Sequence, residues 1–193
     1  MKVLFLNGSP RKNGYTVGVM KCIEEGIDSN HNVEWINAYD LLIKPCQSCL
    51  QCRPDSECHL PHDHGHDVWH KIRSADALII GSPTYYGNMS GPLKTLIDRN
   101  LTAFEAIAAS GLEMPTPLHK GKKAAMVTVC NSPSPISQLP TQSKGTLQAM
   151  EIVPKAGGYD IIGSVTLDGA ASKNEIPLEI RDKAKMLGMD LQS

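Results

Sequence analysis

Four cysteines lie close together in one short segment, and thiolates at such spacing bind metals or carry redox chemistry. Of the six cysteines in the 193 residues, Cys46, Cys49, Cys52 and Cys58 fall within thirteen positions. A Cys-x2-Cys-x2-Cys run with a more distant fourth cysteine can hold a [4Fe–4S] cluster, which takes four thiolate ligands. We therefore predict that these four residues bind such a cluster.

Zinc is the main alternative for the same cysteines. Structural zinc more often pairs two Cys-x2-Cys knuckles separated by a dozen or more residues, which fits this segment less well. The histidines that follow the cysteines complicate this reading: His59, His62, His64, His66 and His70. Mixed ligation by Cys58 with His59 or His62 would overturn the cluster assignment, and thiols that bind no metal are a third alternative. A solvated loop explains the histidines more simply than a metal site does.

A second candidate site lies at residues 8–16, a glycine-rich turn between an apolar run and a helical pattern. The start of a helix favours an anion, to which Ser9 and Thr16 add hydroxyl donors and Arg11 adds charge. The P-loop pattern fails because Tyr15 stands where lysine is needed, and the dinucleotide fingerprint is missing too. The single phosphate of flavin mononucleotide (FMN) remains, although an ordinary strand-to-helix turn explains the same residue types.

A similar segment at residues 81–92 ends another apolar run and precedes another helical pattern. Tyr85 and Tyr86 offer flat surfaces to an isoalloxazine ring, while backbone donors at Gly87 and Asn88 can reach its polar edge. Aromatic residues at strand ends are more often packing residues. This segment, however, holds two of the nine aromatic residues of the chain.

The elements that position these residues alternate between strand and helix. We expect strands at Val3–Asn7, Val33–Asn37, Ala77–Gly81, Ala124–Cys130 and Ile161–Leu167. We expect helices from Thr16 to about Asp28 and at Asp67–Ser74, Pro92–Leu101, Thr146–Ile152 and Leu178–Leu187, the last ended by Gly188. Such alternation predicts an α/β fold, namely a flavodoxin-like, doubly wound, five-stranded parallel sheet in the order 2-1-3-4-5 with helices on both faces. One domain then spans residues 1–193, with a Cys/His-rich insertion at about 45–66.

This order of strands brings the two candidate loops together. Strands one and three flank the switch point of the sheet, where ligands bind beyond the carboxyl ends of the strands. After strand four, Asn131 and Ser132 are placed to donate hydrogen bonds to the edge of a flavin. The sequence thus predicts one site from three separate loops.

The net charge and hydropathy of the sequence limit the classes of partner that we expect. Lys and Arg number 19 and Asp and Glu 20, so the formal net charge is −1. Nucleic acids and anionic membranes select basic surfaces, and no apolar run approaches the ~18 residues of a membrane span. The amino terminus is too briefly hydrophobic for a secretory signal. We expect a cytoplasmic protein with reduced thiols, no nucleic-acid partner and no membrane partner.

Three motifs together resemble the NADPH-dependent FMN reductase superfamily: Gly-Ser-Pro-Arg-Lys-x-Gly from Gly8, Gly-Ser-Pro-Thr-Tyr-Tyr-Gly from Gly81, and Leu-Lys-Thr-Leu-Ile-Asp-Arg from Leu93. The resemblance implies that the FMN phosphate is held by Ser9, Arg11, Asn13 and Thr16. It also implies that the flavin ring lies against Pro83, Thr84, Tyr85, Tyr86, Gly87, Asn88 and Met89. The family usually has Gly-Asn-Thr where this chain has Gly14-Tyr15-Thr16, so Tyr15 is expected to supply a backbone donor, or Asn13 to substitute.

The cysteine run, with Pro45 before it, resembles the iron–sulfur flavoprotein branch of that superfamily. This implies an oxidoreductase that moves electrons between FMN and a [4Fe–4S] cluster, acts as a homodimer or homotetramer, and needs no catalytic side chain of its own. Its redox partners would be a ferredoxin, or NAD(P)H with a small-molecule acceptor. Two alternatives remain: an NAD(P)H-dependent FMN or quinone reductase without a cluster, and a zinc-binding flavodoxin-like module.

Overall fold

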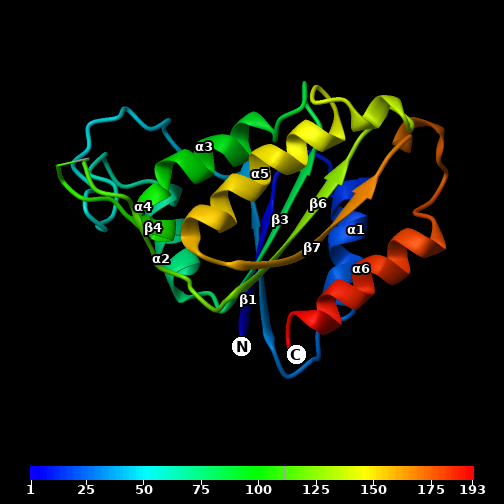
Figure 1. Ribbon diagram of the computed structural model, residues 1–193, viewed down its shortest axis with the longest axis horizontal. Coiled ribbons are helices and arrows are strands. Elements are labelled where there is room, and N and C mark those ends of the chain that lie inside the picture. Colours follow the sequence, from blue (N-terminus) through cyan, green and yellow to red (C-terminus); the bar gives the residue numbers. More distant parts are fainter. Residues whose placement is uncertain (111) are drawn as a thin grey trace.

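Five parallel strands form the central sheet of the protein, whose computed structural model describes every residue except Gly111 (Figure 1). The strands are β1 (Lys2–Asn7), β2 (Asn32–Asn37), β3 (Ala77–Pro83), β6 (Lys123–Val129) and β7 (Asp160–Leu167). Their order is β2-β1-β3-β6-β7, and all four pairings are parallel. This is the 2-1-3-4-5 order, so the predicted flavodoxin-like fold is confirmed.

Helices cover both faces of the sheet. The helices on one face are α1 (Tyr15–Glu24) and α6 (Leu178–Asp190), and those on the other are α2 (His64–Ser74), α3 (Gly91–Arg99), α4 (Leu101–Phe104) and α5 (Ser143–Gly157). Three short 3₁₀ helices are η1 (Ala38–Asp40), η2 (Ile136–Gln138) and η3 (Ala170–Ser172). The strands β4 (Glu105–Ala106) and β5 (Thr116–Pro117) pair antiparallel outside the main sheet. Among the described residues, no helix has both the length and the apolar character needed to cross a bilayer.

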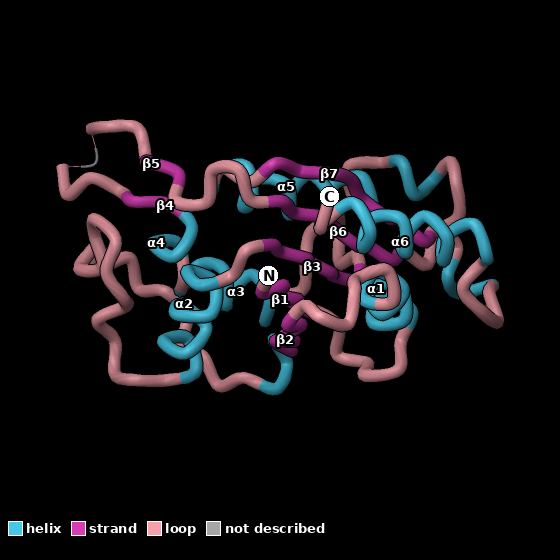
Figure 2. The backbone as a smooth tube through the Cα atoms, turned by 90° about the horizontal axis from the view of Figure 1, so that it is seen from below, coloured by secondary structure: helices cyan, strands magenta, loops and turns pink. Residues whose placement is uncertain are grey.

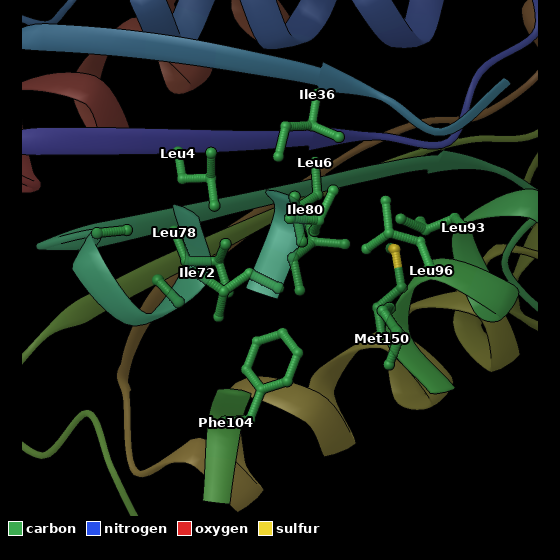
Figure 3. Close-up of a cluster of buried hydrophobic side chains, with 14 of the residues drawn as sticks. Leu4, Leu6, Ile36, Ile72, Leu78, Ile80, Leu93, Leu96, Phe104 and Met150 are labelled. Carbon is green, nitrogen blue, oxygen red and sulfur yellow. The ribbon is translucent and has the colours of Figure 1, made fainter. Parts of the chain in front are cut away.

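Alternate residues of the strands feed two hydrophobic cores, because successive side chains point to opposite faces of a sheet. Leu4 and Leu6 of β1 face the side of α2, α3 and α5, where Figure 3 shows them with Phe104 and Met150. Phe5 faces α1 and α6 instead. Strands buried on both faces explain the nearly continuous apolar runs in the sequence.

The helices differ from expectation in their ends. The second helix begins at His64 rather than Asp67, because Asp63 caps it: its Oδ1 accepts from the Gly65 N–H at 2.9 Å. The predicted helix Pro92–Leu101 is divided into α3 and α4, with Asn100 between them.

Gly188 does not end the last helix, which continues to Asp190. A Cβ at Gly188 would lie 2.0 Å from the carbonyl oxygen of Ile23 and 2.9 Å from Cα of Gly26. This glycine therefore serves the close packing of α6 on α1, and the sequence-based assignment of it as a helix end is wrong.

One end of the molecule carries most of the irregular chain. Residues 44–63, here called the cysteine loop, and the β4–β5 hairpin project from the same end (Figures 1 and 2). In Figure 1 they are the cyan and green segments at the left, beside α2 and α4. The loop lies between η1 and α2, and α2 begins within the range of about 45–66 that was predicted as an insertion.

Candidate functional site

A pocket of about 700 Å³ lies beyond the carboxyl ends of β1, β3 and β6. That size is within the range of small-molecule and cofactor sites. The residues that line this strand-end pocket are Ser9, Pro10, Arg11, Asn13, Gly14, Tyr15, Thr16, Pro83, Thr84, Tyr85, Val129, Cys130, Asn131, Ser132, Gln142 and Ala170. The three loops that the sequence brought forward therefore meet at one cavity.

The first wall is the turn from β1 into α1. The Ser9 N–H donates to the side-chain oxygen of Asn7 at 2.9 Å, and the Arg11 N–H donates to Ser9 Oγ at 3.2 Å. Gly14 caps α1 without a side-chain hydrogen bond, and the first turn of the helix has no acidic residue. Unpaired N–H groups and the positive end of the helix dipole therefore remain available to an anion.

Charge in the pocket suits an anion as well. Arg11 carries the one formal charge among the described lining residues, and none of them is acidic. Ser9 and Thr16 are buried at 7% and 3% exposure, so their hydroxyl groups are fixed parts of the wall. The first loop thus combines one cation, two hydroxyl groups and a helix start.

The second wall is the turn after β3. Tyr85 and Asn88 exchange two backbone hydrogen bonds of 3.0 and 2.9 Å. Tyr86 and Gly87 between them have positive φ angles of 51° and 74°. This tight turn directs Tyr85 to the pocket and leaves Tyr86 completely exposed.

Four of the residues expected at the flavin ring do not belong to the lining: Tyr86, Gly87, Asn88 and Met89. Met89 is 5% exposed and packs in the hydrophobic core instead. Asn88 stabilises the turn, because its side-chain oxygen accepts from the Met89 N–H at 2.9 Å. These residues shape the loop that carries Pro83, Thr84 and Tyr85.

The third wall contains a residue that sequence reasoning missed. The side-chain oxygen of Gln142 accepts from Cys130 Sγ at 3.2 Å and from Ser132 Oγ at 3.1 Å. Gln142 precedes α5 and lies ten residues beyond Ser132, so no local motif indicates it. Cys130 is buried and also contributes to the lining.

Partly buried hydrogen bonds hold the third wall in place. Asp168, directly after β7, accepts from Ser137 Oγ at 2.7 Å and from Ser143 Oγ at 2.9 Å. Thr146 of α5 bonds to Thr84 Oγ1 at 3.2 Å, which ties the second wall to the third. The walls of the pocket are therefore stabilised by polar side chains, of which Ser137, Ser143 and Thr146 are buried.

The cysteine loop has a different construction. It has no helix or strand before α2, Cys46 and Cys49 are exposed, and Cys52 and Cys58 are half-buried. Ser48 and Leu50, on either side of Cys49, have positive φ angles of 55° and 63°. The chain thus turns sharply around Cys49, and the six cysteines are all free thiols.

The loop is fastened to the body of the protein by its second half. The carbonyl oxygen of Ser56 accepts from Thr102 Oγ1 at 2.8 Å. That of Pro54 accepts from the Ile107 N–H at 2.7 Å, and that of Cys58 lies 2.8 Å from Nε2 of His66.

An ion pair fastens the two ends of the loop. Arg99 of α3 bonds to both carboxylate oxygens of Asp63 at 2.8 and 3.1 Å and to the carbonyl oxygen of Lys44 at 2.5 Å. Burial opposes ionisation of Asp63, but the hydrogen bonds from Arg99 and from two backbone N–H groups outweigh it and lower its pKa to about 2. The pair is therefore charged at any ordinary pH.

Four thiols in one anchored loop match the ligand chemistry of an iron–sulfur cluster. Burial is the main reason that the pKa of Cys52 is raised, and the other three cysteines of the loop raise it further as close neighbours. In the described part of the chain, no three His, Cys, Asp or Glu side chains gather as ligands of one metal ion. In a cubane cluster each thiolate binds a different iron atom, so the cysteines need not gather around one ion. The fit of this loop to a cluster therefore rests on its four thiol donors.

The histidines after the cysteines have contacts of their own. His64 Nδ1 accepts from the Leu42 N–H at 2.9 Å, and His70 Nε2 lies 3.0 Å from a carboxylate oxygen of Glu57. His62 stacks on His66 with ring centroids 4.7 Å apart. His59 is exposed. Through these contacts His64, His66 and His70 help to hold the cysteine loop in place.

Comparison with known proteins gives a consistent set of relatives. The family model for NADPH-dependent FMN reductase matches residues 1–165. An iron-sulfur flavoprotein of Archaeoglobus fulgidus is 39% identical over 104 residues, which are 53% of this chain and 50% of that protein. The chain thus spans about half the length of that relative. An iron-sulfur flavoprotein of Clostridioides difficile is 27% identical over 186 residues, covering 95% of this chain and 74% of the other.

A solved structure with the same fold is an FMN-dependent NADH-azoreductase from Bacillus anthracis in complex with FMN. It superposes with a TM-score of 0.69 at 17% sequence identity, over 98% of this chain and 97% of its own. At that identity the likeness establishes the fold alone.

Proposed function

The chain belongs to the NADPH-dependent FMN reductase family, and from that premise we propose that it is an FMN-dependent oxidoreductase that also carries a [4Fe–4S] cluster. The observation that supports the flavin most directly is the strand-end pocket, with its uncapped helix start and its single positive charge. Relatives named iron-sulfur flavoproteins support the cluster, together with the four free thiols of the cysteine loop.

The first wall of the pocket would bind the FMN phosphate. Ser9 and Thr16 offer hydroxyl donors, Arg11 offers charge, and Asn13 and Tyr15 complete the turn. Backbone N–H groups at the start of α1 would share the phosphate charge. In this proposal the phosphate is held by these donors without a metal ion.

The other two walls would bind the flavin ring. Pro83, Thr84 and Tyr85 lie on one side of the pocket, and Asn131 and Ser132 on the other. The four residues from Tyr86 to Met89 would act by shaping their loop. When bound, FMN accepts two electrons as hydride or single electrons, whereas the protein supplies position and electrostatics. No side chain is assigned as a general acid or base.

The thiolates of Cys46, Cys49, Cys52 and Cys58 would hold the cluster, which exchanges one electron at a time. An enzyme with both groups converts between paired and single electrons. We therefore propose NAD(P)H or a ferredoxin as redox partners, a small molecule as an acceptor, and a homodimer or homotetramer in the cytoplasm.

One purification tests this function. Protein prepared without oxygen is assayed for iron, acid-labile sulfide and flavin, and we expect about four irons and one FMN per chain. Zinc at one per chain without iron would favour the zinc-binding module. Flavin without metal, together with NAD(P)H turnover, would favour a plain FMN or quinone reductase.

A single substitution tests whether the two sites are separate. Cys49→Ser changes an exposed residue of the cysteine loop and should abolish iron binding while FMN affinity stays the same. Cys22→Ser is the matched control, because Cys22 lies in α1, away from both sites, and should keep its iron. Loss of iron and flavin together in Cys49→Ser would contradict two independent sites.

A further inference from the structure

Arg99 is the most deeply buried charged residue near the cysteine loop. Its side chain is 0% exposed, and it reaches the loop from the last position of α3. One edge of the guanidinium group binds both oxygens of Asp63, and Nη1 also binds the carbonyl oxygen of Lys44. This ion pair joins residues that are 36 positions apart in the sequence.

The same guanidinium group lies beside Cys58. Burial alone would lower the pKa of Arg99, but the hydrogen-bonded Asp63 and the adjacent Cys58 side chain raise it above its ordinary value. Nε of Arg99 is buried and has no hydrogen-bond partner among the described residues. The guanidinium group thus keeps one buried donor without a partner, and Cys58 is one of the side chains that act on the group.

The backbone of Cys58 is anchored to the first turn of α2. Its carbonyl oxygen lies 2.8 Å from Nε2 of His66, and His66 is 6% exposed within the first turn of α2. Cys46 and Cys49, in contrast, are exposed at the outer turn of the loop. The backbone of Cys58 is therefore tied to the same helix start that Asp63 caps and that Arg99 contacts through Asp63.

Stability alone does not account for this arrangement. Removing two charges from water costs several kcal/mol, and well-packed apolar side chains in place of a buried ion pair are often as stable or more stable. Hydrogen bonds and charges next to a cluster sulfur, in contrast, change its reduction potential directly. The position of the free donor is therefore better explained by an action on Cys58.

We infer that Arg99 is a positioning residue for the fourth thiolate, donating from Nε to Sγ of Cys58 and holding a positive charge at that corner of the cluster. The inference rests on the proposed function. A positive charge favours the reduced cluster, which carries one more electron, so Arg99 raises the reduction potential. Asp63 partly offsets that charge and so keeps the potential from rising further.

Two charge-changing variants test the inference because it predicts shifts of opposite sign. Arg99→Gln should lower the reduction potential of the cluster by at least about 59 mV, which corresponds to a factor of ten in the one-electron equilibrium constant. Asp63→Asn keeps the capping oxygen of α2 but leaves Arg99 uncompensated, so it should raise the potential. Arg99→Lys keeps the charge and should give a smaller decrease than Arg99→Gln.

The measurement is a redox titration of the holoprotein followed by electron paramagnetic resonance, with iron content, circular dichroism and flavin potential on the same samples. Arg181→Gln, on α6 at the other face of the sheet, is the control and should leave the cluster potential unchanged. The flavin potential should stay constant in every variant. A purely structural role of Arg99 would change iron content or unfolding, but would not give two shifts of opposite sign.

Each result decides the inference. Shifts in the same direction in Arg99→Gln and Asp63→Asn, or no shift in either, would overturn it while leaving the proposed function intact. If Arg99→Gln loses its iron, Asp63→Asn decides: a higher potential supports the inference, and an unchanged or lower one overturns it. Wild-type protein without iron would instead overturn the proposed function, and this inference with it.

Discussion

The strand-end pocket and the cysteine loop are built in opposite ways. The pocket lies where three buried strands end, and its walls are braced by buried side chains such as Ser143 and Thr146. The cysteine loop is exposed, contains no helix or strand before α2, and is held by a few separate hydrogen bonds. The first site follows from the fold, whereas the second depends on individual anchors that the fold does not require.

This contrast predicts different responses to mutation. A change in the packing of the pocket should affect both stability and flavin binding, because the same contacts serve the core and the site. A change in an anchor of the loop should affect metal retention, with little effect on the rest of the protein. Disturbing either region should leave the ligand of the other in place.

The largest effect of a single substitution is expected from Gly145→Ala. A Cβ at this position would lie 1.7 Å from the carbonyl oxygen of Pro140 and 2.8 Å from that of Gly87, so the second and third walls would be forced apart. We expect a loss of about 2–3 kcal/mol in the free energy of unfolding. FMN affinity should fall by about two orders of magnitude, since each factor of ten corresponds to about 1.4 kcal/mol.

Urea denaturation and a fluorescence titration with FMN measure the two effects. Gly91→Ala is the matched control, because a Cβ there meets no atom within 4 Å. Iron content should be the same in both variants. If Gly145→Ala released iron as readily as flavin, the two regions would be coupled and the comparison would fail.

The sequence predicted the pocket better than the loop, for a physical reason. Apolar runs bounded by turns located all five strands of the sheet, and strand order then placed the loops after β1, β3 and β6 together. The sequence did not predict Gln142 as a lining residue, because its place there depends on hydrogen bonds with Cys130 and Ser132. No local sequence pattern indicates such bonds.

The loop showed the reverse. Cysteine spacing led to the prediction of a cluster in the loop, but not of its anchors, which join residues far apart in the chain, such as Thr102 and Ser56 at a separation of 46 positions. The β4–β5 hairpin, with two residues in each strand, is too short to give a periodic pattern. Its Ile107 supplies an anchor that sequence reasoning therefore did not foresee.

Acid should weaken the support of the cysteine loop before it weakens the pocket. His119 is 1% exposed; its Nε2 lies 2.8 Å from the carbonyl oxygen of Ala103 in α4, and burial lowers its pKa from 6.5 to about 4. The unfolded chain therefore takes up the proton first as the pH falls. Stability from this group is complete above pH 6.5 and is lost progressively towards pH 4, by up to about 3 kcal/mol.

Urea denaturation between pH 7 and 4 measures this loss, and hydrogen exchange of the α4 amides locates it. His119→Gln removes the titrating ring, so the free energy of unfolding should depend less on pH in this range. His59→Gln, at an exposed position, should keep the wild-type dependence. An equally steep curve in His119→Gln would show that other groups govern the acid response.

The smallest and most local effect is expected from Thr102→Val, which removes one anchor of the loop without changing its volume greatly. Thr102 Oγ1 donates to the carbonyl oxygen of Ser56 and accepts from Trp69 Nε1 at 3.3 Å. Both hydrogen bonds are lost, and the one to Ser56, which holds the loop, contributes about 1 kcal/mol, so iron transfer to a chelator should become about fivefold faster. Thr95→Val is the control, because Thr95 has no side-chain hydrogen bond among the described residues. FMN affinity should be the same in both variants, since neither residue lines the strand-end pocket. Iron release at the wild-type rate in Thr102→Val would mean that the loop is held by the cluster itself rather than by its anchors.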